Sequence, residues 1–403
     1  MLNSFPIDTN MSIPAKIILF ACSTLCLAVS SAGQDSSPGK WQFNGYIKDL
    51  QMISYENFRK EWYLNNEINN RMTLKWFPAN GLVLEAGMRI RFLFGNYIQL
   101  MQYQLPDFSK TMDRDPGFLD LTWVMDDADS YVFLAGLDRL NLKYSFKKWE
   151  FNLGRQRINW GTNFIWTPND IFNSFSYFDF DYEERPGCDA LQIEYYPGMT
   201  SSVQLAASLN HDRRLTAAAM YRFNRREYDF QFMAGQMVED LVIGGGWSGD
   251  ISGGGFRGEF TYFRSAENFS DTTGQLVAAI DGDYTLKSGL YLHASALYNS
   301  AGTTGKAGGS TMLDLRNISV KDFTRARYSL FGEIAYPVTP LVRADLAGIY
   351  NPCDHSFFIG PSVDISLTDN LYLLLIAQLF YGADGTEYGD YGKFWYVRLK
   401  WSF

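Results

Sequence analysis

The sequence predicts an all-β fold, a transmembrane antiparallel barrel of about eighteen strands with short turns at one rim and long loops at the other. Three observations predict it. The last ten residues alternate strictly between apolar and polar side chains. Similar alternating segments recur along the chain between turn residues, while helical periodicity is almost absent. After residue 32 no apolar run approaches the roughly 20 residues that a spanning helix needs.

The first 32 residues have the pattern of a cleavable signal peptide. Lys16 precedes an apolar run that ends at Val29, and Ser30-Ser31-Ala32 supplies the small residues needed for cleavage before Gly33. Met11 could be the true start, because residues 1–10 add only a polar, acidic extension. The alternative, lipoprotein processing at Cys22 or Cys26, is opposed by bulky neighbouring residues. We therefore expect an exported chain in which residues 33–403 form a single domain.

The strands are expected to follow one another from residue 41 to the carboxyl terminus. Their ranges are 41–56, 59–77, 82–96, 131–146, 149–158, 187–197, 201–210, 214–224, 227–240, 241–251, 255–266, 274–286, 289–300, 325–337, 340–352, 355–368, 370–382 and 393–403. The count is even, as single-chain bacterial barrels require, and becomes sixteen if two strands near 240–255 merge. Connections after even strands are brief. The long segments all follow odd strands, which places them together on the extracellular rim: 97–130, 159–186, 301–324 and 383–392.

Alternation also decides which side chains enter the lumen. In strand 82–96 every second residue from Leu84 to Phe94 is apolar, so Arg89 and Arg91 point inward. A charge on the lipid face near the midplane costs roughly 2–4 kcal/mol, which enforces this phase. The same alternation turns inward a further set: Arg139, Lys143, Arg343, Asp345, Arg398 and Lys400. An inward arginine either lines the permeation path or pairs with a neighbouring acid and closes the wall.

The final strand combines an apolar outer face with a cationic inner one. Trp401 and Phe403 belong to the outward row, and this ending resembles the C-terminal signal by which bacterial outer-membrane proteins are recognised for assembly. The alternative is the last strand of a soluble sandwich, which rarely carries two Trp and a terminal Phe on its buried face.

Strand 149–158 departs from plain alternation, because its pleat would send Arg155 and Arg157 into lipid. A bulge at Gly154, or departure from the membrane there, would resolve the conflict. Residues 154–198 carry the series GRQRINWG, WTPNDIFN and RPG-DALQIEYYPG in that order, the last with a cysteine inserted before the aspartate. With its surroundings, residues 137–198, this segment resembles the alginate-export-like and related uncharacterised porin families of Gram-negative outer membranes. The resemblance implies an outer-membrane barrel of about this size and leaves the cargo open.

The 28-residue loop 159–186 is rich in Trp, Phe and Tyr, so it should pack on a surface rather than extend into water. We expect it to fold into the lumen as a constriction, with a cap over the mouth as the alternative. A fold into the lumen would set its charged residues against Arg89, Arg91, Arg139, Arg155 and Arg157. These loop residues are Asp170, Asp179, Asp181, Glu183 and Glu184, and Arg185 is a further residue expected at the constriction.

Other kinds of site are weakly supported. His293 and Ser295 share a strand face, but no orienting acid follows from the sequence, so we expect no enzyme. Asp126, Asp127 and Asp129 could hold Ca²⁺, although such loops are usually just solvated; we expect no metal and no cofactor. Cys188 and Cys353 could pair only if a loop crosses the mouth. The net charge of −9 argues against nucleic acid as a partner.

Two functions remain open. The first is an outer-membrane porin, a passive diffusion channel for small hydrophilic or charged solutes, and the mixed charges of the inward rows favour it. The second is a substrate-specific barrel that exports or imports a polysaccharide together with partners, as the alginate-export resemblance implies. The expected partners are outer-membrane lipid, the barrel-assembly machinery, small solutes or ions, and a further copy of the chain in a homo-oligomer.

Overall fold

A computed structural model describes residues 40–55, 62–105, 107–113, 115–181, 185, 187–270, 273–308 and 318–403. The predicted signal peptide and the loop residues Glu183 and Glu184 lie outside the described residues. One sheet contains all the described strands: β1 (Trp41–Tyr55), β2 (Trp62–Ala79), β3 (Leu82–Phe94), β4 (Thr122–Ala128), β5 (Tyr131–Phe146), β6 (Trp149–Gln156), β7 (Cys188–Gly198), β8 (Ser201–Leu209), β9 (Leu215–Arg225), β10 (Tyr228–Met237), β11 (Asp240–Ile251), β12 (Gly254–Ser265), β13 (Gln275–Thr285), β14 (Tyr291–Asn299), β15 (Tyr328–Thr339), β16 (Val342–Tyr350), β17 (Phe357–Thr368), β18 (Leu371–Tyr381) and β19 (Lys393–Ser402).

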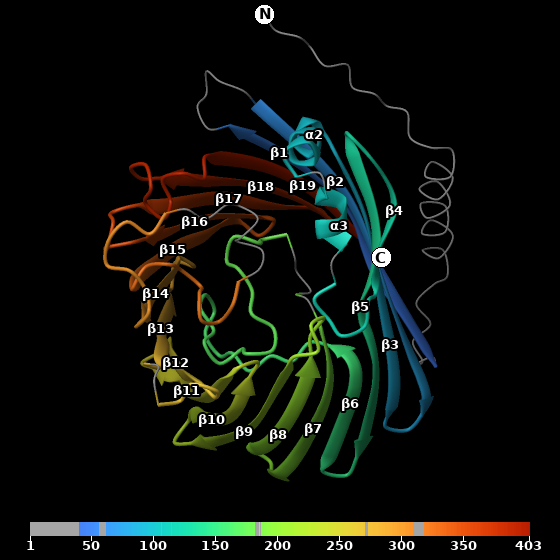
Figure 1. Cartoon of the computed structure of the whole chain (residues 1–403), viewed down its shortest axis with the longest axis vertical. Coiled ribbons are helices and arrows are strands. Elements are labelled where there is room, and N and C mark those ends of the chain that lie inside the picture. The colour runs from blue at the N-terminus through green and yellow to red at the C-terminus, as the bar shows by residue number, and fades with distance from the viewer. Residues whose placement is uncertain are drawn as a thin grey trace, which may run out of the picture.

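The sheet closes on itself, because β1 pairs antiparallel with both β2 and β19 (Figure 1). Eighteen strands make this closed wall. Among the described strands, β4 pairs only with β5. It uses the same edge of β5 as β6 does, but it pairs with residues 131–136, whereas β6 pairs with residues 140–146. The barrel and its strand count of eighteen are confirmed, since β11 and β12 are separate strands joined by a tight turn.

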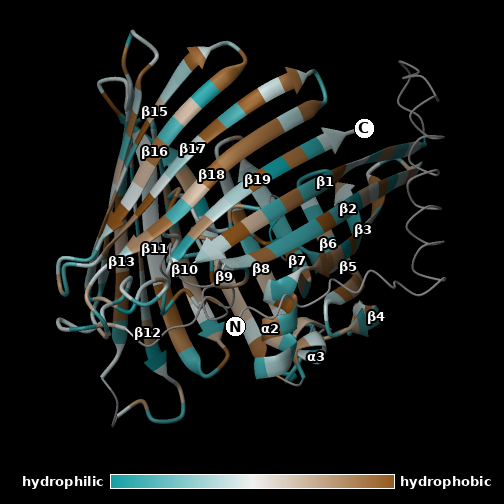
Figure 2. Cartoon of the chain, turned by 90° about the horizontal axis from the view of Figure 1, so that it is seen from above, coloured by the Kyte–Doolittle hydropathy of each residue, from teal (hydrophilic) through white to brown (hydrophobic). Residues whose placement is uncertain are grey.

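The long connections follow β3, β6, β14 and β18, all on the rim opposite the short turns. Along the wall strands polar and apolar residues alternate, as the banding of β17 to β19 shows (Figure 2). Trp395, Val397 and Leu399 are exposed on the outside, while Phe394, Tyr396 and Arg398 are buried on the inside. The sequence predicts this assignment of outward and inward residues in the last strand.

The first long connection is more ordered than a plain loop. It contains α2 (Asn96–Gln104) and α3 (Phe108–Asp113) before β4. Ile98 and Phe108 from these helices pack with Leu93, Val132 and Leu134 from β3 and β5. These apolar residues are what hold the connection against the barrel. No helix in the described part of the chain is long and apolar enough to cross a membrane.

The conflict at Gly154 is resolved in two ways: Arg155 stays in β6 and pairs with Asp115 and Asp189, and the chain leaves the wall before Arg157. Gly154 has a positive φ of 114°, but the pairing of β5 with β6 continues through it without a register shift, so the alternative of a bulge there is wrong. Strand β6 ends after Gln156, and the chain then leaves the wall. A register shift lies instead between β3 and β5, where Gly87 and Met88 face Arg139 and Leu137.

Candidate functional site

The segment from residue 157 to 181 lies against the inner wall of the barrel. Its first contacts are with β8 and β10: Trp160 Nε1 donates to Gln204 Oε1 (2.8 Å), and Gln231 Nε2 donates to the Trp160 carbonyl (2.7 Å). Trp160 is fully buried. The backbone amide of Ile158 donates to Asn173 Oδ1 (2.9 Å), which closes the segment on itself.

Glu259 on β12 is the central anchor of the segment. One carboxylate oxygen accepts from the amides of Thr162 and Asn163, and the other accepts from the amide of Asn169 (3.0 Å). The buried carboxylate thereby satisfies three backbone donors of an irregular loop, which would otherwise be costly to bury. Asn169 in turn donates to the Gly245 carbonyl (3.0 Å). A Cβ at Gly244 would lie 2.8 Å from Asn169 Oδ1, so only glycine allows this close approach.

Aromatic side chains hold the second half of the segment. Tyr177 contacts Phe331 and Phe358, and Phe178 contacts Phe358 and Phe380, all with ring centroids within 6.1 Å. Phe180 meets Tyr396 at 4.8 Å. These partners come from β15, β17, β18 and β19. The loop therefore follows the inner wall around most of its circumference, as the trace inside the ring shows (Figure 1).

The segment ends in ion pairs with the wall. Asp181 lies 2.7 Å from Lys48 Nζ on β1 and 3.6 Å from Arg398 Nη1 on β19. Arg139 on β5 then donates to the Arg185 carbonyl (2.8 Å). Asp181 thus faces cations of the wall, but they are Lys48 and Arg398 and not the arginines that the sequence predicts opposite the loop.

Arg155 does not contribute to the lumen, contrary to expectation. Its guanidinium pairs with Asp115 (2.6 Å) and Asp189 (2.8 Å), and donates to the carbonyls of Leu119 and Leu137. Residues 115–121 thus fill the gap that β6 leaves in the wall when the chain turns inward. The sequence could not show this, because Asp115 lies in a connection whose path depends on the gap itself.

Asp170 lies near Arg157 but makes no ion pair with it. Its side chain is fully buried between loop and wall, and Oδ1 accepts from the Trp160 amide (3.4 Å). Burial raises the pKa of Asp170 to about 8, although the nearby Arg157 and the amide of Trp160 oppose this shift. Asp170 is therefore a structural acid of the loop and not a surface of the channel.

Most of the predicted wall charges are paired. Arg91 makes two bonds to Glu67 (2.7 and 3.0 Å), and Arg89 lies 4.0 Å from the same carboxylate. Arg71 pairs with Asp138 (2.9 Å), a pair that the alternation alone did not identify. The remaining contacts follow the same pattern: Lys143 with Glu150 (2.5 Å), Arg343 with Asp345 (2.9 Å) and with Glu333 (3.8 Å), and Lys400 over the ring of Tyr46.

Two predicted charges of the loop make no ion pair or side-chain hydrogen bond with any residue that the structure describes. Arg157 is half-buried, and Asp179 is exposed. Arg185 lies near both, over the ring of Phe175. Burial, and then the charge of Arg157, lowers the pKa of Arg185 to about 10. Arg157, Asp179 and Arg185 are the described loop charges that remain for a passing solute.

The alternative Ser–His arrangement does not form. His293 Nε2 contacts Asp281 (2.6 Å), and its Nδ1 contacts Glu333 (3.4 Å). Ser295 donates to the Ile280 carbonyl (2.9 Å) instead of approaching His293. Cys188 and Cys353 are both free thiols. Within the described ranges no three His, Cys, Asp or Glu side chains gather in a way that could hold a metal ion.

The outer loops meet around two carboxylates. Glu387 accepts from the Arg325 amide (2.8 Å) and from Asn351 Nδ2 (2.9 Å). Asp354 accepts from the Glu387 amide (2.7 Å) and from Ser356 Oγ (2.6 Å). The connections after β14, β16 and β18 are thereby joined above the barrel.

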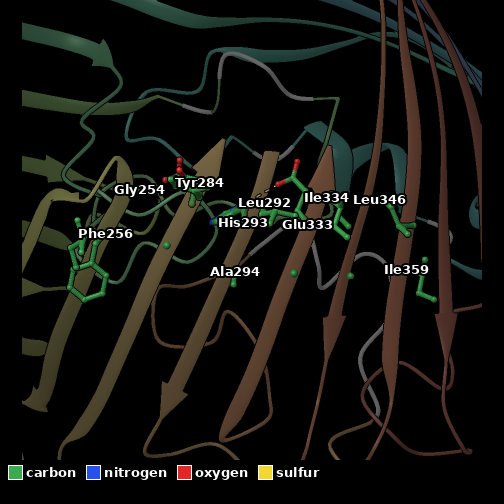
Figure 3. A pocket seen from close by; sticks show the side chains of 17 residues that line it. Gly254, Phe256, Tyr284, Leu292, His293, Ala294, Glu333, Ile334, Leu346 and Ile359 are labelled. Atoms are coloured by element: carbon green, nitrogen blue, oxygen red, sulfur yellow. Dashed lines mark hydrogen bonds and ion pairs between the residues drawn. The ribbon is translucent and has the colours of Figure 1, made fainter. Parts of the chain in front are cut away.

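One cavity of about 750 Å³ lies on the outside of the wall, not on a path through it (Figure 3). A row of small outward residues on β13 to β16 forms its floor: Gly282, Ala294, Gly332 and Gly348. Phe256, Ile334 and Leu346 border it (Figure 3).

Comparison with known proteins identifies the fold. No family model and no curated protein sequence matches the chain. Among solved structures, OccAB4 of Acinetobacter baumannii is similar with a TM-score of 0.56 and 7% identity, over 91% of this chain and 100% of that one. OccK8 (OprE) of Pseudomonas aeruginosa gives 0.54 and 11%, over 90% and 98%. OprD of Pseudomonas aeruginosa gives 0.54 and 7%, over 90% and 95%. At such identities the likeness concerns the barrel fold alone.

Proposed function

We propose that the chain is a porin of a Gram-negative outer membrane, a passive channel for small hydrophilic or charged solutes. One observation carries the proposal: a closed eighteen-stranded barrel holds its long loop along the inner wall. Barrels of 16 to 18 strands are wide enough to leave an aqueous channel. A loop fixed inside such a barrel narrows it and sets a size limit. Barrel-assembly machinery and outer-membrane lipid are the partners that this location implies.

The charges of the lumen support a size filter with modest ion selectivity. Wall arginines such as Arg91 are held by neighbouring carboxylates, so their fields are largely cancelled. Arg157 and Asp179 carry opposite signs, and neither makes an ion pair with a residue that the structure describes, although both lie close enough to Arg185 to act on its charge. Selectivity in a channel depends on which charges face the ion, so these two residues should affect it most.

A substrate-specific export or import barrel of the alginate-export kind is the alternative. The resembling motifs at residues 154–198 hold the residues that anchor the inner loop, Trp160 and Asn169 among them. An anchored inner loop would narrow a diffusion channel and an export barrel alike, so these residues do not distinguish the two functions. Paired wall charges give no continuous cationic path for a polyanion, which favours the diffusion channel.

The test is a recording of single channels from purified protein in a planar bilayer, joined to liposome swelling with sugars of increasing size. The porin should show steady ohmic openings, and swelling should stop sharply above a limiting sugar size. A barrel that stays closed until a periplasmic or surface partner is added would contradict the proposal and support the export alternative.

A further inference from the structure

The outer face of β1 and β2 carries a polar patch, which we define as Asp49, Gln51 and Asn66. Asp49 pairs in register with Leu399, and Gln51 pairs with Val397, both exposed on the outside of β19. On the other edge of β1, Asp49 faces Ile68 and Gln51 faces Asn66. Directly paired residues of antiparallel strands lie on one face, so the patch points out of the barrel.

The patch lies midway between the two ends of the wall. At one end Tyr55 stacks on Trp62 (5.1 Å). At the other end Trp41 stacks on Trp76 (5.1 Å). Aromatic girdles of this kind mark the two membrane interfaces of a transmembrane barrel. Asp49, near the middle of β1, is therefore at the depth where a charged group in lipid is least favourable.

The patch is not matched elsewhere on the outer wall. In β5 to β19, as far as the structure describes them, outward positions away from the strand ends carry apolar side chains, alanine or glycine. Ile280, Ile334 and Leu375 are examples, each exposed. Lipid tails satisfy these positions, but they offer Asp49 no hydrogen-bond donor.

The side chains of the patch complement one another. Asp49 is half-buried and accepts a bond from Gln51 Nε2 (3.2 Å), while Gln51 is exposed. The amides of Gln51 and Asn66 offer donors, and the Asp49 carboxylate accepts. A surface that holds both donors and an acceptor can bind its own copy across a two-fold axis, because each group then meets the complementary one.

We propose that the polar patch is covered by the same patch of a second copy of the chain, related by a two-fold axis along the membrane normal. The inference rests on the proposed membrane location of the barrel. A second copy fits this face because its Gln51 and Asn66 amides would supply donors to Asp49, and outward positions away from the strand ends of β5 to β19 supply none. The dimer contact would remove the carboxylate from lipid and leave the lumen of each barrel unchanged.

Cross-linking in the outer membrane tests the contact. In a Cys188→Ser, Cys353→Ser background, Gln51→Cys and Asn66→Cys place thiols in the patch, and Ile280→Cys places one on β13 as the control. A short thiol-specific cross-linker should give a dimer band from both patch variants and none from the control. Monomer from both patch variants, or equal dimer from Ile280→Cys, would overturn the proposal.

A second measurement removes the polar groups. Native mass spectrometry of the wild type should show a dimer, and Asp49→Leu combined with Gln51→Leu should convert most of it to monomer. Apolar residues are favoured on a lipid face, so the variant should keep its heat-modifiable folded band. A wild type that is monomeric or trimeric would overturn the two-fold contact. Failure of the wild type to fractionate with outer membranes would instead refute the proposed location.

Discussion

At the scale of single residues, most charges inside the barrel are already engaged with a neighbour. The alternation predicts that Arg89 and Arg91 face inward, and β2 then supplies Glu67 to hold them. The face on which a residue lies depends only on alternation within its own strand, so the sequence is enough to predict it. Pairing depends on register between strands and on loops, as in Lys48 with Asp181, 133 residues apart. The inward arginines can therefore be predicted from the sequence, but most of their partners cannot.

Arg155 should be the most important single residue for the integrity of the wall. Arg155→Ala would leave Asp115 and Asp189 buried without their cation, a change that typically costs about 3–5 kcal/mol. We expect the temperature at which the folded gel band disappears to fall, and residues 115–121 to become sensitive to protease. The matched control is Arg214→Ala, whose pair with Glu239 is exposed and should cost only about 0–1 kcal/mol. Equal effects of the two changes would contradict the role given to Arg155.

Arg157 should influence ion selectivity more than the paired arginines do. Arg157→Glu reverses a charge that makes no ion pair in the described part of the chain, so the reversal potential in a salt gradient should shift toward cations. The shift should be largest at low ionic strength, where the Debye length is about 30 Å, and small near 1 M, where it is about 3 Å. Arg89→Glu with Arg91→Glu places negative charge beside Glu67 and should mainly destabilise the barrel. A larger selectivity change from the second variant would show that the wall pairs line the path.

At the scale of elements, the last strand and the outer loops illustrate what alternation can and cannot predict. The sequence predicts strand β19 and the residues on its outer face, because side chains alternate regularly wherever one face of a strand meets lipid. The joined loops above the barrel were not predicted, since their contacts come from isolated side chains with no period. The helices α2 and α3 could not be predicted for the same reason: they are short and lie in a segment without a repeated pattern.

Phe403 should be needed for closure of the barrel. Its amide donates to the Gly45 carbonyl (2.9 Å), Gly45 donates to the Phe403 carbonyl (3.0 Å), and its ring stacks on Phe43 (5.8 Å). Deletion of Phe403, or Phe403→Asp, should greatly reduce the heat-modifiable folded band on unheated gels. Phe403→Tyr, which keeps the ring and the backbone bonds, should restore it. Normal accumulation of folded protein after the deletion would show that the terminal residue is dispensable.

The outer loops should pack more firmly in mild acid than in mild base. Burial raises the pKa of Glu387 to about 7, from an ordinary value of 4.5, so the folded loops prefer the neutral acid. Their stability should therefore rise as the pH falls from above 7 toward 4.5. Burial opposes ionisation of Asp354, but bonds from Ser356 and from backbone amides lower its pKa, so it stays charged in this range.

Hydrogen exchange of residues 382–392, corrected for the intrinsic pH dependence of the rate, measures this effect. Protection should be greater at about pH 5.5 than at about pH 8 in the wild type. Glu387→Gln mimics the neutral acid and should give the same protection at both pH values. A wild type whose protection is independent of pH would show that Glu387 does not control these loops.

At the scale of the whole molecule, the barrel follows from the repeated alternating strands. The constriction arises at one place, where the chain leaves the wall after β6. Eighteen alternating segments specify a closed wall, and their parity places every long connection on one rim. The aromatic content of residues 159–186 indicated that the loop must pack, but not on which side chains. Its anchors, Glu259 and Gln204, lie on distant strands and become recognisable only when the wall brings them together.

The constriction is tested by removing the inner loop and measuring the channel. Residues 172–181 are replaced by a short Gly-Ser linker, with Glu259 and its three bonds to the first half of the loop left intact. Single-channel conductance in a planar bilayer should rise several-fold and the limiting sugar size in liposome swelling should increase, because the wall and not the loop would then limit the path. An unchanged conductance from a folded, heat-modifiable variant would contradict the claim that this loop forms the constriction.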